Sequence, residues 1–457
     1  MKLPQLPPDF EQLFTEIHKK KRLGEVIRLA DRLHSETEYH HWNELRHHHP
    51  VHKGFSHEEW WCALKLKRKA AYREIPLLDR RGRPFHYFIP DTIQKLLHEI
   101  DFGAGAYIGM PDPIANPQTR DRYIVSSLIQ EAITSSQLEG AVTTREVAKE
   151  LIRSGRTPRD KSERMILNNF RTMQEIIRLK DQPLSVPVLL DLHRRVTDQT
   201  LDNPSAAGRF RHPEELVKVG DDEGQIYHDP PPAEQLEERA QHLCDFANGK
   251  SPVLFVPPAI RAILLHFWLA YDHPFVDGNG RTARALFYWS MLHSGFWLFE
   301  FISISNILVK APAQYAKAFL FTETDDNDLN YFIVHQADVI RRAIEALHAY
   351  IDRKRKETKT AETRLRVLRQ LNHRQQALIT HALRHPSQEY TVASHRVSHG
   401  VAYATARADL LDLKRFDLLR QSTRGKTMVF EPARDLSKRL DAMSNAKDDS
   451  QEPTASG

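Results

Sequence analysis

The sequence contains almost no cysteine and no long hydrophobic run. Among its 457 residues only Cys62 and Cys244 are cysteines, too few for a disulfide framework and without a nearby partner at metal-ligand spacing. No run of about 18 apolar residues occurs, and the N-terminal sequence MKLPQLPPDF lacks the apolar stretch of a signal peptide. These absences predict a cytoplasmic protein that is neither exported nor inserted into a membrane.

The residues that are present are typical of a folded protein with more than one domain. Hydrophobic residues make up 40% and charged residues 27% of a chain longer than one hydrophobic core usually supports. The net charge of +5 is unevenly distributed, because residues 361–440 hold 15 Lys or Arg against 7 Asp or Glu. A basic C-terminal region favours DNA as a partner there.

Residues 1–105 are expected to form a mostly helical region, since their helical periodicity is broken by proline-marked turns. The histidines at 47–49 could bind a metal ion. Neighbouring histidines on a helix point to different faces, however, so a solvated helix end is the favoured interpretation. Trp60 and Trp61 are expected in the core.

Helical periodicity becomes clearer after residue 120. A helix is expected over about 122–140, with an apolar face that includes Leu128 and Ile129, and it ends in the polar sequence SSQLEG. Residues 208–229, GRFRHPEELVKVGDDEGQIYHD, then place two short runs around a glycine-containing turn, which predicts a β-hairpin. Three further helices are expected between these segments, over 145–153, 161–179 and 187–199.

Two helices are expected around a loop rich in polar residues. Ala259–Tyr271 is apolar nearly all round and follows two prolines, so it predicts a central buried helix. A second helical pattern runs from Arg281 to Leu292 and stops at Ser294-Gly295. The sequence HPFVDGNGRTAR, residues 273–284, joins the two helices.

The end of this joining sequence is suited to bind phosphate. A helix N-terminus following Asn279-Gly280-Arg281 offers unpaired N–H groups and the positive end of the helix dipole. Gly278 and Gly280 let the backbone approach a ligand closely. Arg281 and Arg284 can add charge-assisted hydrogen bonds. The pattern predicts a polyphosphate site.

Two other residues of this joining sequence could take part in a reaction at that site. Asp277 is a hard oxygen ligand of the kind that holds Mg²⁺ next to phosphates. His273 is the residue of the group that can accept a proton near neutral pH. Together they favour attack by a hydroxyl, deprotonated by His273, on a Mg-bound phosphoryl centre. The alternative, a plain turn with surface arginines, suits an isolated DGNG but not this combination.

The same twelve residues resemble the motif HxFx(D/E)GNGRxxR of the Fic (Fido) family at every defined position. The resemblance covers roughly residues 100–350 and implies a Fic-type helical core with a β-hairpin flap, over 106–350. It also implies a Mg-dependent nucleotidyltransferase that moves AMP from ATP to a Tyr, Ser or Thr hydroxyl of a target protein or of itself. By this resemblance His273 is the general base, Phe275 anchors the loop and Asp277 binds Mg²⁺.

The phosphate-binding residues follow from the same resemblance. Asn279 and Gly280 form the anion hole, with Gly278 beside them, and Arg281 and Arg284 hold phosphates of ATP. Relatives that transfer phosphate or phosphocholine use the same scaffold, and such a site can also remove AMP. The intact Gly280 of the GNGR sequence favours AMP transfer.

The helix end SSQLEG resembles the inhibitory motif (S/T)xxxE(G/N) of this family through Ser135, Glu139 and Gly140. In relatives of this type the glutamate pairs with the second arginine of the motif, here Arg284, and excludes the productive pose of ATP. The resemblance thus implies an autoinhibited enzyme. On its own, the pattern would describe an ordinary capped helix.

The hairpin over 208–229 corresponds to the family's flap, which holds a target segment by strand addition. The sequence GRFR resembles the usual start of this flap and consists of Gly208, Arg209, Phe210 and Arg211. A surface hairpin without this role is the alternative. Tyr315 is compatible both with core packing and with an adenine contact.

The C-terminal part is expected to form a separate module. The sequence RKRKETKTAETR predicts a charged linker or helix over 351–370. Three short helical patterns and two β-prone runs around a basic turn then predict a winged helix-turn-helix over 371–440. Residues 441–457 are expected to be a disordered tail. DNA contacts are assigned to Thr405, Arg407, Lys414 and Arg415.

Two functions follow from these patterns. The first is a self-inhibited protein adenylyltransferase with an accessory winged helix. The second is a DNA-binding transcriptional regulator whose Fic core only senses nucleotide. An intact His273 favours the first, because a sensor needs no base. The sequence leaves open the target protein, the signal that relieves inhibition and whether the chain forms a homo-oligomer.

Overall fold

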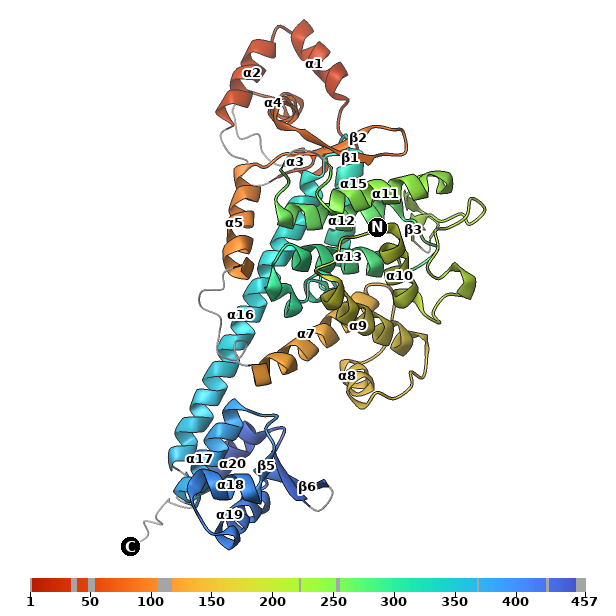
Figure 1. The fold of residues 1–457 in the computed structure, drawn as a ribbon. Coiled ribbons are helices and arrows are strands. Elements are labelled where there is room, and N and C mark those ends of the chain that lie inside the picture. Colours follow the sequence, from red (N-terminus) through yellow and green to blue (C-terminus); the bar gives the residue numbers. More distant parts are fainter. Residues whose placement is uncertain are drawn as a thin grey trace. The chain divides into compact units, whose positions relative to one another are not determined.

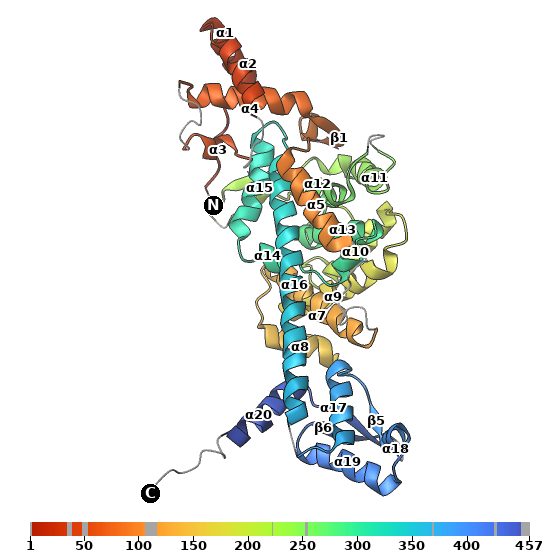
Figure 2. The same ribbon diagram turned by 90° about the vertical axis from the view of Figure 1, so that its left-hand side faces the viewer.

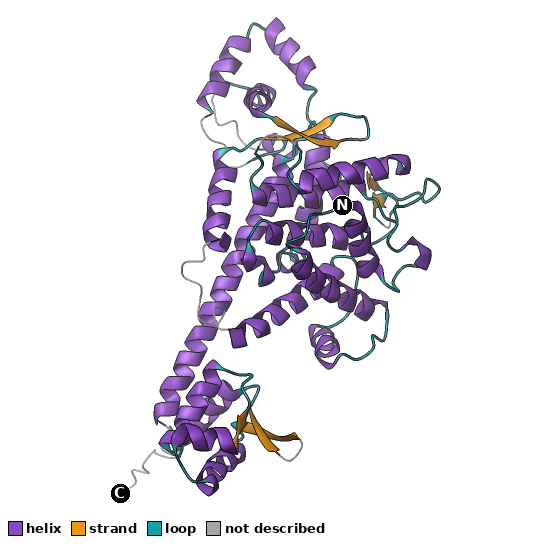
Figure 3. Ribbon diagram, viewed as in Figure 1, coloured by secondary structure: helices purple, strands orange, loops and turns teal. Residues whose placement is uncertain are grey.

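The computed structural model describes residues 2–33, 39–47, 54–105, 117–221, 223–251, 255–367, 370–424 and 427–448. These parts are mainly helical, with short antiparallel strands in three small sheets (Figure 3). The predicted mainly α fold is confirmed. Two compact units make up the chain, one from residues 1–106 and 127–345 and the other from residues 107–126 and 346–457.

The N-terminal region folds as short helices around tryptophan side chains. Trp42, Trp60 and Trp61 belong to one buried cluster, as expected for the last two. His47 is exposed, and residues 48 and 49 of the predicted histidine cluster lie outside the described residues. The helices here are α1 (Phe10–Lys19), α2 (Leu23–Arg32), α3 (Trp42–Leu45), α4 (His57–Ala71) and α5 (Asp91–Gly105).

A β-hairpin interrupts this helical region, which the sequence analysis did not predict. β1 (Arg73–Leu78) pairs with β2 (Pro84–Tyr87), and the register shifts between Ile75 and Leu78. Pro76 lies at that irregularity, since proline has no N–H to donate to a partner strand. The proline obscures the strand pattern in the sequence.

Two buried helices form the centre of the first unit. Both ribbon views place α12 (Pro258–Asp272) and α13 (Asn279–His293) among surrounding helices (Figures 1 and 2). Most of their residues are buried, including nearly all of α12, as its apolar sequence predicts. Around them lie α7 (Pro117–Gln137), α8 (Arg145–Ser154), α9 (Lys161–Leu179), α10 (Val186–Thr197), α11 (Leu236–Ala247), α14 (Ser305–Leu308), α15 (Pro312–Thr324) and the start of α16 (Asn330–Val367).

A short hairpin lies between α10 and α11 in the sequence. β3 (Val219–Gly220) pairs with β4 (Ile226–His228), with Val219 opposite His228. The hairpin falls within the predicted range 208–229, but residues 208–218 precede it as loops and turns. None of the described helices is both long and apolar enough to cross a lipid bilayer.

The second unit has its own hydrophobic core, which includes Leu378, Leu410 and Phe430. Its three strands pair in the order β5-β7-β6. Helices and a hairpin of two strands follow one another in this unit in the predicted order. That the unit is a winged helix-turn-helix and that it binds DNA both stay predictions. The elements are α17 (His373–Arg384), β5 (Tyr390–Thr391), α18 (Val392–His399), α19 (Tyr403–Arg415), β6 (Leu419–Arg424), β7 (Thr427–Pro432) and α20 (Leu436–Asp448).

The predictions for the charged segment and for the tail can be compared with the helices of this part. Of the two alternatives for residues 351–370, a charged linker or a helix, the structure has the helix: α16 continues through Val367, because its lysines, arginines and glutamates are good helix formers. Residues 441–448, expected to be part of a disordered tail, are helical instead, since α20 continues to Asp448 and buries Leu436 and Leu440 in the core. The rest of that predicted tail lies outside the described residues.

Candidate active site

The loop between α12 and α13 turns sharply at both ends. His273 ends α12 with φ 44, and Gly278 precedes α13 with φ 84. A Cβ atom on Gly278 would lie 2.6 Å from Cγ2 of Thr197 on α10. Both the positive φ and the close approach of α10 therefore require glycine at this position.

The side chain of Asn279 closes the loop. Its Oδ1 accepts from the Phe275 N–H at 3.0 Å, and its Nδ2 donates to the Phe275 carbonyl at 2.8 Å. Because its side chain is engaged in these two hydrogen bonds, Asn279 has only its backbone N–H, at the start of α13, to offer to the predicted anion hole. Phe275 is fully buried, as the anchor role expects. This double contact fixes the distance between His273 and the helix N-terminus.

His193 braces the loop from α10, and sequence reasoning missed it. Its Nδ1 accepts from the Gly208 N–H at 3.1 Å, so its Nε2–H donates to the Asp277 carbonyl at 2.9 Å. The ring stacks on Phe275 with centroids 3.7 Å apart. Burial lowers the pKa of His193 to about 4, which keeps the ring neutral in this single tautomer.

His273 is oriented as a proton acceptor. Its Nδ1 lies 3.2 Å from the Ala270 carbonyl oxygen, so Nδ1 carries the proton and Nε2 keeps its lone pair. Burial lowers the pKa of His273 to about 4, and the hydrogen bond to Ala270 only partly opposes this. The imidazole is therefore neutral at physiological pH, as a general base must be.

Arg281 supplies buried positive charge at the start of α13. The side chain is almost fully buried, and its Nη1 donates to the Val196 carbonyl at 3.2 Å. Among the described residues Nε and Nη2 have no hydrogen-bond partner, although Nη2 lies 3.5 Å from Oδ1 of Asp277. Unsatisfied buried donors are costly, so an anion bound here would be stabilised.

The second arginine is already engaged by the end of α7. Arg284 donates from Nε to the Ser135 hydroxyl at 2.8 Å and from Nη2 to the Ser135 carbonyl at 2.9 Å. The same Nη2 lies 2.9 Å from Oε1 of Glu139. Burial opposes the charge on Arg284, yet the Glu139 carboxylate leaves the pKa of Arg284 raised.

The Glu139 carboxylate also lies against the first turn of α13. A Cβ atom on Gly280 would collide with Oε1 of Glu139, so the carboxylate lies directly against the backbone at this position. The first N–H groups of a helix lack intrahelical partners, and the first backbone bond of α13 runs from Thr282 to Gly278. Glu139 thus places a negative charge where the helix N-terminus and Arg284 attract one.

Asp277 is exposed beside the helix N-terminus and fits one role in Mg²⁺ binding. No group of three His, Cys, Asp or Glu side chains within the described residues could form a ready metal site. Mg²⁺ commonly binds through one or two carboxylates together with substrate phosphates and water. A single exposed carboxylate next to the N-terminus of α13 fits that pattern.

The residues predicted to start the flap support the loop instead of reaching the hairpin. Arg211 donates from its backbone N–H to the Pro274 carbonyl at 2.9 Å and from Nε to the His273 carbonyl at 3.0 Å. Phe210 packs on Phe275, while Arg209 pairs with Glu215 at 2.7 Å. Gly208, with φ 78, donates to His193 as described above.

His228 fastens the hairpin to the end of α12. Its Nε2 lies 2.6 Å from the Tyr271 carbonyl oxygen, and its Nδ1 lies 2.7 Å from Oε2 of Glu323 on α15. Both partners only accept, so both ring nitrogens donate and the ring is an imidazolium. Burial opposes this charge, yet Glu323 and the Tyr271 carbonyl leave the pKa of His228 raised.

The hairpin is therefore expected to loosen as the pH rises. The pKa of His228 is higher in the fold than the unfolded value of about 6.5, so its stabilisation is complete below that pH and is lost as the pH passes the folded pKa. Hydrogen exchange of residues 219–228, corrected for intrinsic rates, should increase over this range. In Glu323→Gln the same loss should occur at lower pH. Unchanged protection in both proteins would contradict the imidazolium.

The remaining predicted site residues lie elsewhere. Tyr315 is half-buried, and its hydroxyl lies 2.7 Å from Nε2 of His266. Both interpretations, core packing and an adenine contact, stay predictions. Four residues predicted to contact DNA lie on α19, where Arg407, Lys414 and Arg415 are exposed and Thr405 is half-buried.

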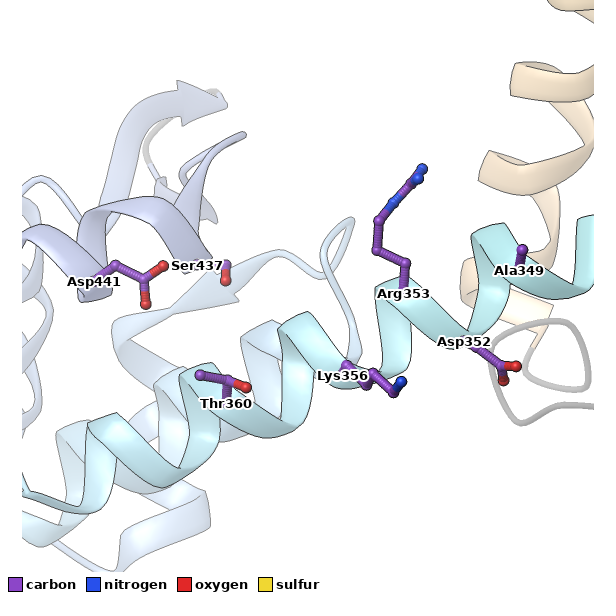
Figure 4. A pocket seen from close by; sticks show the side chains of 7 residues that line it. All are labelled: Ala349, Asp352, Arg353, Lys356, Thr360, Ser437 and Asp441. Carbon is purple, nitrogen blue, oxygen red and sulfur yellow. The ribbon is translucent and has the colours of Figure 1, made fainter. Parts of the chain in front are cut away.

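A separate cavity of about 620 Å³ lies in the second unit, between α16 and α20 (Figure 4). Asp352, Arg353 and Lys356 line it from α16, and Ser437 and Asp441 line it from α20. Both charge signs are mixed along its walls. It contains none of the residues that surround His273.

Comparison with known proteins points to one family for the region around His273. A model of the Fic/DOC family matches residues 183–291. The protein adenylyltransferase Fic of Nematostella vectensis is 25% identical over 259 residues, 55% of this chain and 56% of that protein. The protein adenylyltransferase fic-1 of Caenorhabditis elegans is 37% identical over 113 residues, 25% of this chain and 20% of that protein.

The chain thus spans about half the length of the first of these relatives and a fifth of the second. Among solved structures, a Fic family protein from Desulfovibrio desulfuricans G20 aligns over 76% of this chain and 98% of its own length. That alignment has 18% identity and a TM-score of 0.49.

Proposed function

Because residues 183–291 form a Fic/DOC family domain, we propose that this protein is a Mg-dependent protein adenylyltransferase held in an inhibited state by Glu139. Its acceptor is a Tyr, Ser or Thr hydroxyl of a target protein or of the chain itself. One observation carries the proposal: a neutral His273 lies in the same short loop as an anion-binding helix N-terminus flanked by buried arginines.

In the proposed reaction His273 Nε2 accepts the proton of the acceptor hydroxyl. The hydroxyl oxygen then forms a bond to the α-phosphorus of ATP, and the bond from that phosphorus to the bridging oxygen breaks. Pyrophosphate leaves, and AMP stays on the target as a phosphodiester. The backbone N–H groups at the start of α13 and the unpaired donors of Arg281 stabilise the charge on the phosphates.

Asp277 would hold Mg²⁺, which supplies neutralisation of the phosphate charge when it is bound. The carboxylate is exposed and lies beside the helix N-terminus, so it can reach a nucleotide from the solvent side. His193 has no part in the chemistry but keeps the Asp277 carbonyl, and with it the loop, in place.

Inhibition is proposed to arise because Glu139 occupies the position of a phosphate group. Its carboxylate interacts with Arg284 and lies against Gly280 at the start of α13. A phosphate cannot share this place with a carboxylate of the same charge sign. Nucleotide therefore binds weakly or in a pose that turns the α-phosphate away from His273.

The hairpin of β3 and β4 is proposed to hold the target segment by strand addition. Its β4 strand is fixed to the carbonyl of Tyr271, two residues before His273, through the imidazolium of His228. A segment paired to this hairpin would present an acceptor hydroxyl near the base. Main-chain pairing demands little of the target's sequence.

A DNA-binding regulator is the second candidate, favoured by exposed arginines on α19 next to the β6–β7 hairpin. In that case His273→Ala would leave function unchanged. As an accessory activity, DNA binding would weaken with rising salt and with Arg407→Ala.

The position of the radiolabel tests the reaction class. We expect the Glu139→Gly protein, incubated with Mg²⁺ and a cell lysate, to label proteins from ATP labelled at the α-phosphate and not from ATP labelled at the γ-phosphate. Label from the γ-phosphate alone would indicate a kinase and contradict the proposal. The same lysate with each labelled nucleotide but without the added Glu139→Gly protein serves as the blank, and its label is subtracted.

A further inference from the structure

α7, the proposed inhibitory helix, contacts α13 through more residues than those of its C-terminal end. Glu131, Ser135 and Glu139 are spaced four residues apart, so they share one face of α7 and the turn that follows it. Opposite them, Arg284 and Tyr288 are also four apart on α13. Ser135 and Glu139 bind Arg284, and Oε2 of Glu131 accepts from the Tyr288 hydroxyl at 2.8 Å.

Glu131 is the member of this row whose carboxylate accepts several hydrogen bonds from neighbouring elements. Its side chain is 1% exposed, and Oε2 also accepts from the Ser303 hydroxyl at 2.8 Å and from the Ser305 N–H at 3.1 Å. Its Oε1 accepts from the Ser305 hydroxyl. A buried carboxylate is tolerated only when such donors replace water, and charge-assisted bonds of this kind are strong.

These contacts fix the position of α7 along α13. A slide of one helical turn, about 5.4 Å, would break every contact of the row at once. Glu139 lies beyond the last residue of α7 and its side chain is 24% exposed, so its own ion pair is the weaker attachment. The donors around Glu131 hold the helix on which Glu139 depends.

We propose that Glu131 is a positioning residue that keeps α7 in register with α13, and so keeps Glu139 on Arg284. This inference rests on the proposed function. It assigns the stability of the inhibited state to a buried carboxylate two turns away from the inhibitory glutamate. A purely structural role for Glu131 predicts loss of activity or of folding on substitution, whereas the positioning role predicts a gain of activity.

The test measures transfer of α-labelled AMP by full-length variants with ATP and Mg²⁺. Glu131→Gln keeps the shape of the side chain but replaces an acceptor with an N–H₂ group facing donors. Tyr288→Phe removes one of the donors to Glu131, together with the acceptor of the Ile304 N–H, and is the second variant. We expect transfer to rise about 5- to 50-fold over wild type for Glu131→Gln and less for Tyr288→Phe. Glu238→Gln, exposed on α11, is the matched control and should leave transfer unchanged.

Two further results identify the mechanism. In a Glu139→Gly background, Glu131→Gln should raise transfer by less than about 2-fold, because both changes release the same restraint. Hydrogen exchange of residues 127–140 should increase in Glu131→Gln, while that of α12 stays the same.

The outcomes separate this inference from the proposed function. Wild-type transfer in folded Glu131→Gln and Tyr288→Phe, with an active Glu139→Gly protein, would overturn the positioning role alone. If Glu131→Gln does not fold, Tyr288→Phe with unchanged transfer overturns it. An inactive Glu139→Gly protein would overturn the proposed function and this inference with it.

Discussion

Transfer of AMP is expected to fall by about 10²- to 10⁴-fold when His273→Ala is introduced into the Glu139→Gly protein. The variant loses the Nε2 lone pair that is proposed to take the acceptor's proton and whose orientation is set by the Nδ1 contact with Ala270. Nucleotide binding should persist, because the backbone of α13 and Arg281 are untouched. Single-turnover transfer and calorimetry with ATP measure the two effects separately.

A surface histidine provides the control for this variant. His242 is exposed on α11, so His242→Ala should change neither transfer nor binding. The pKa of His273 at about 4 adds a second expectation, because a base works in its unprotonated form. Protonation of His273 should therefore leave transfer by the Glu139→Gly protein nearly constant from pH 8 down to about pH 5.5. Retained transfer in His273→Ala would exclude this residue as the base.

Glu139→Gly is expected to raise AMP transfer by about 10- to 100-fold over wild type. The substitution removes the carboxylate from the first turn of α13 and frees Arg284 Nη2 for phosphate. Arg284 should remain in place, since its Nε and Nη2 still donate to the hydroxyl and carbonyl of Ser135. The gain should appear mainly as a lower concentration of ATP at half-maximal rate.

A stability cost should accompany that gain. Arg284 is buried, and removing one member of a buried ion pair leaves its charge less well compensated, so the melting temperature should fall. Added ATP and Mg²⁺ should restore part of the loss by binding to the folded state. Glu139→Gly with wild-type transfer and a lower melting temperature would mean that the Glu139–Arg284 pair is structural and not inhibitory.

The sequence carried enough information to predict a compact candidate site, because the residues that form it are close together in the chain. Residues 273–278 join α12 to α13, the rest of the twelve-residue motif forms the start of α13, and a short loop between helices has few ways to fold. The end of α7 was recognisable as a helix end followed by glycine, and Gly140 does take φ 85. Local patterns of this kind are where sequence reasoning is strongest.

The residues that sequence reasoning missed act across long separations. Glu131 meets Tyr288 across 157 residues and His193 meets Asp277 across 84, so no spacing pattern marks either pair. His228 looked like an ordinary strand residue, and its charge follows only from two acceptors on other helices. Packing of distant elements, not local propensity, selects these contacts.

The type of a residue also did not tell whether its side chain is available for a ligand or holds the loop in place. Asn279 and Arg211 both have side chains suited to bind a phosphate or a target. In the fold, Asn279 closes the loop on Phe275, while Arg211 holds the carbonyls of His273 and Pro274. Each side chain shapes the loop in this structure, and the predicted contacts with nucleotide or target stay predictions.

The most direct test compares wild type, Glu139→Gly and Glu139→Gly/His273→Ala in one assay with α-labelled ATP, Mg²⁺ and a cell lysate. The account predicts weak label for wild type, strong label for Glu139→Gly and none for the double variant. Equal label in all three, or none in any while ATP still binds, would contradict an inhibited adenylyltransferase that uses His273 as its base.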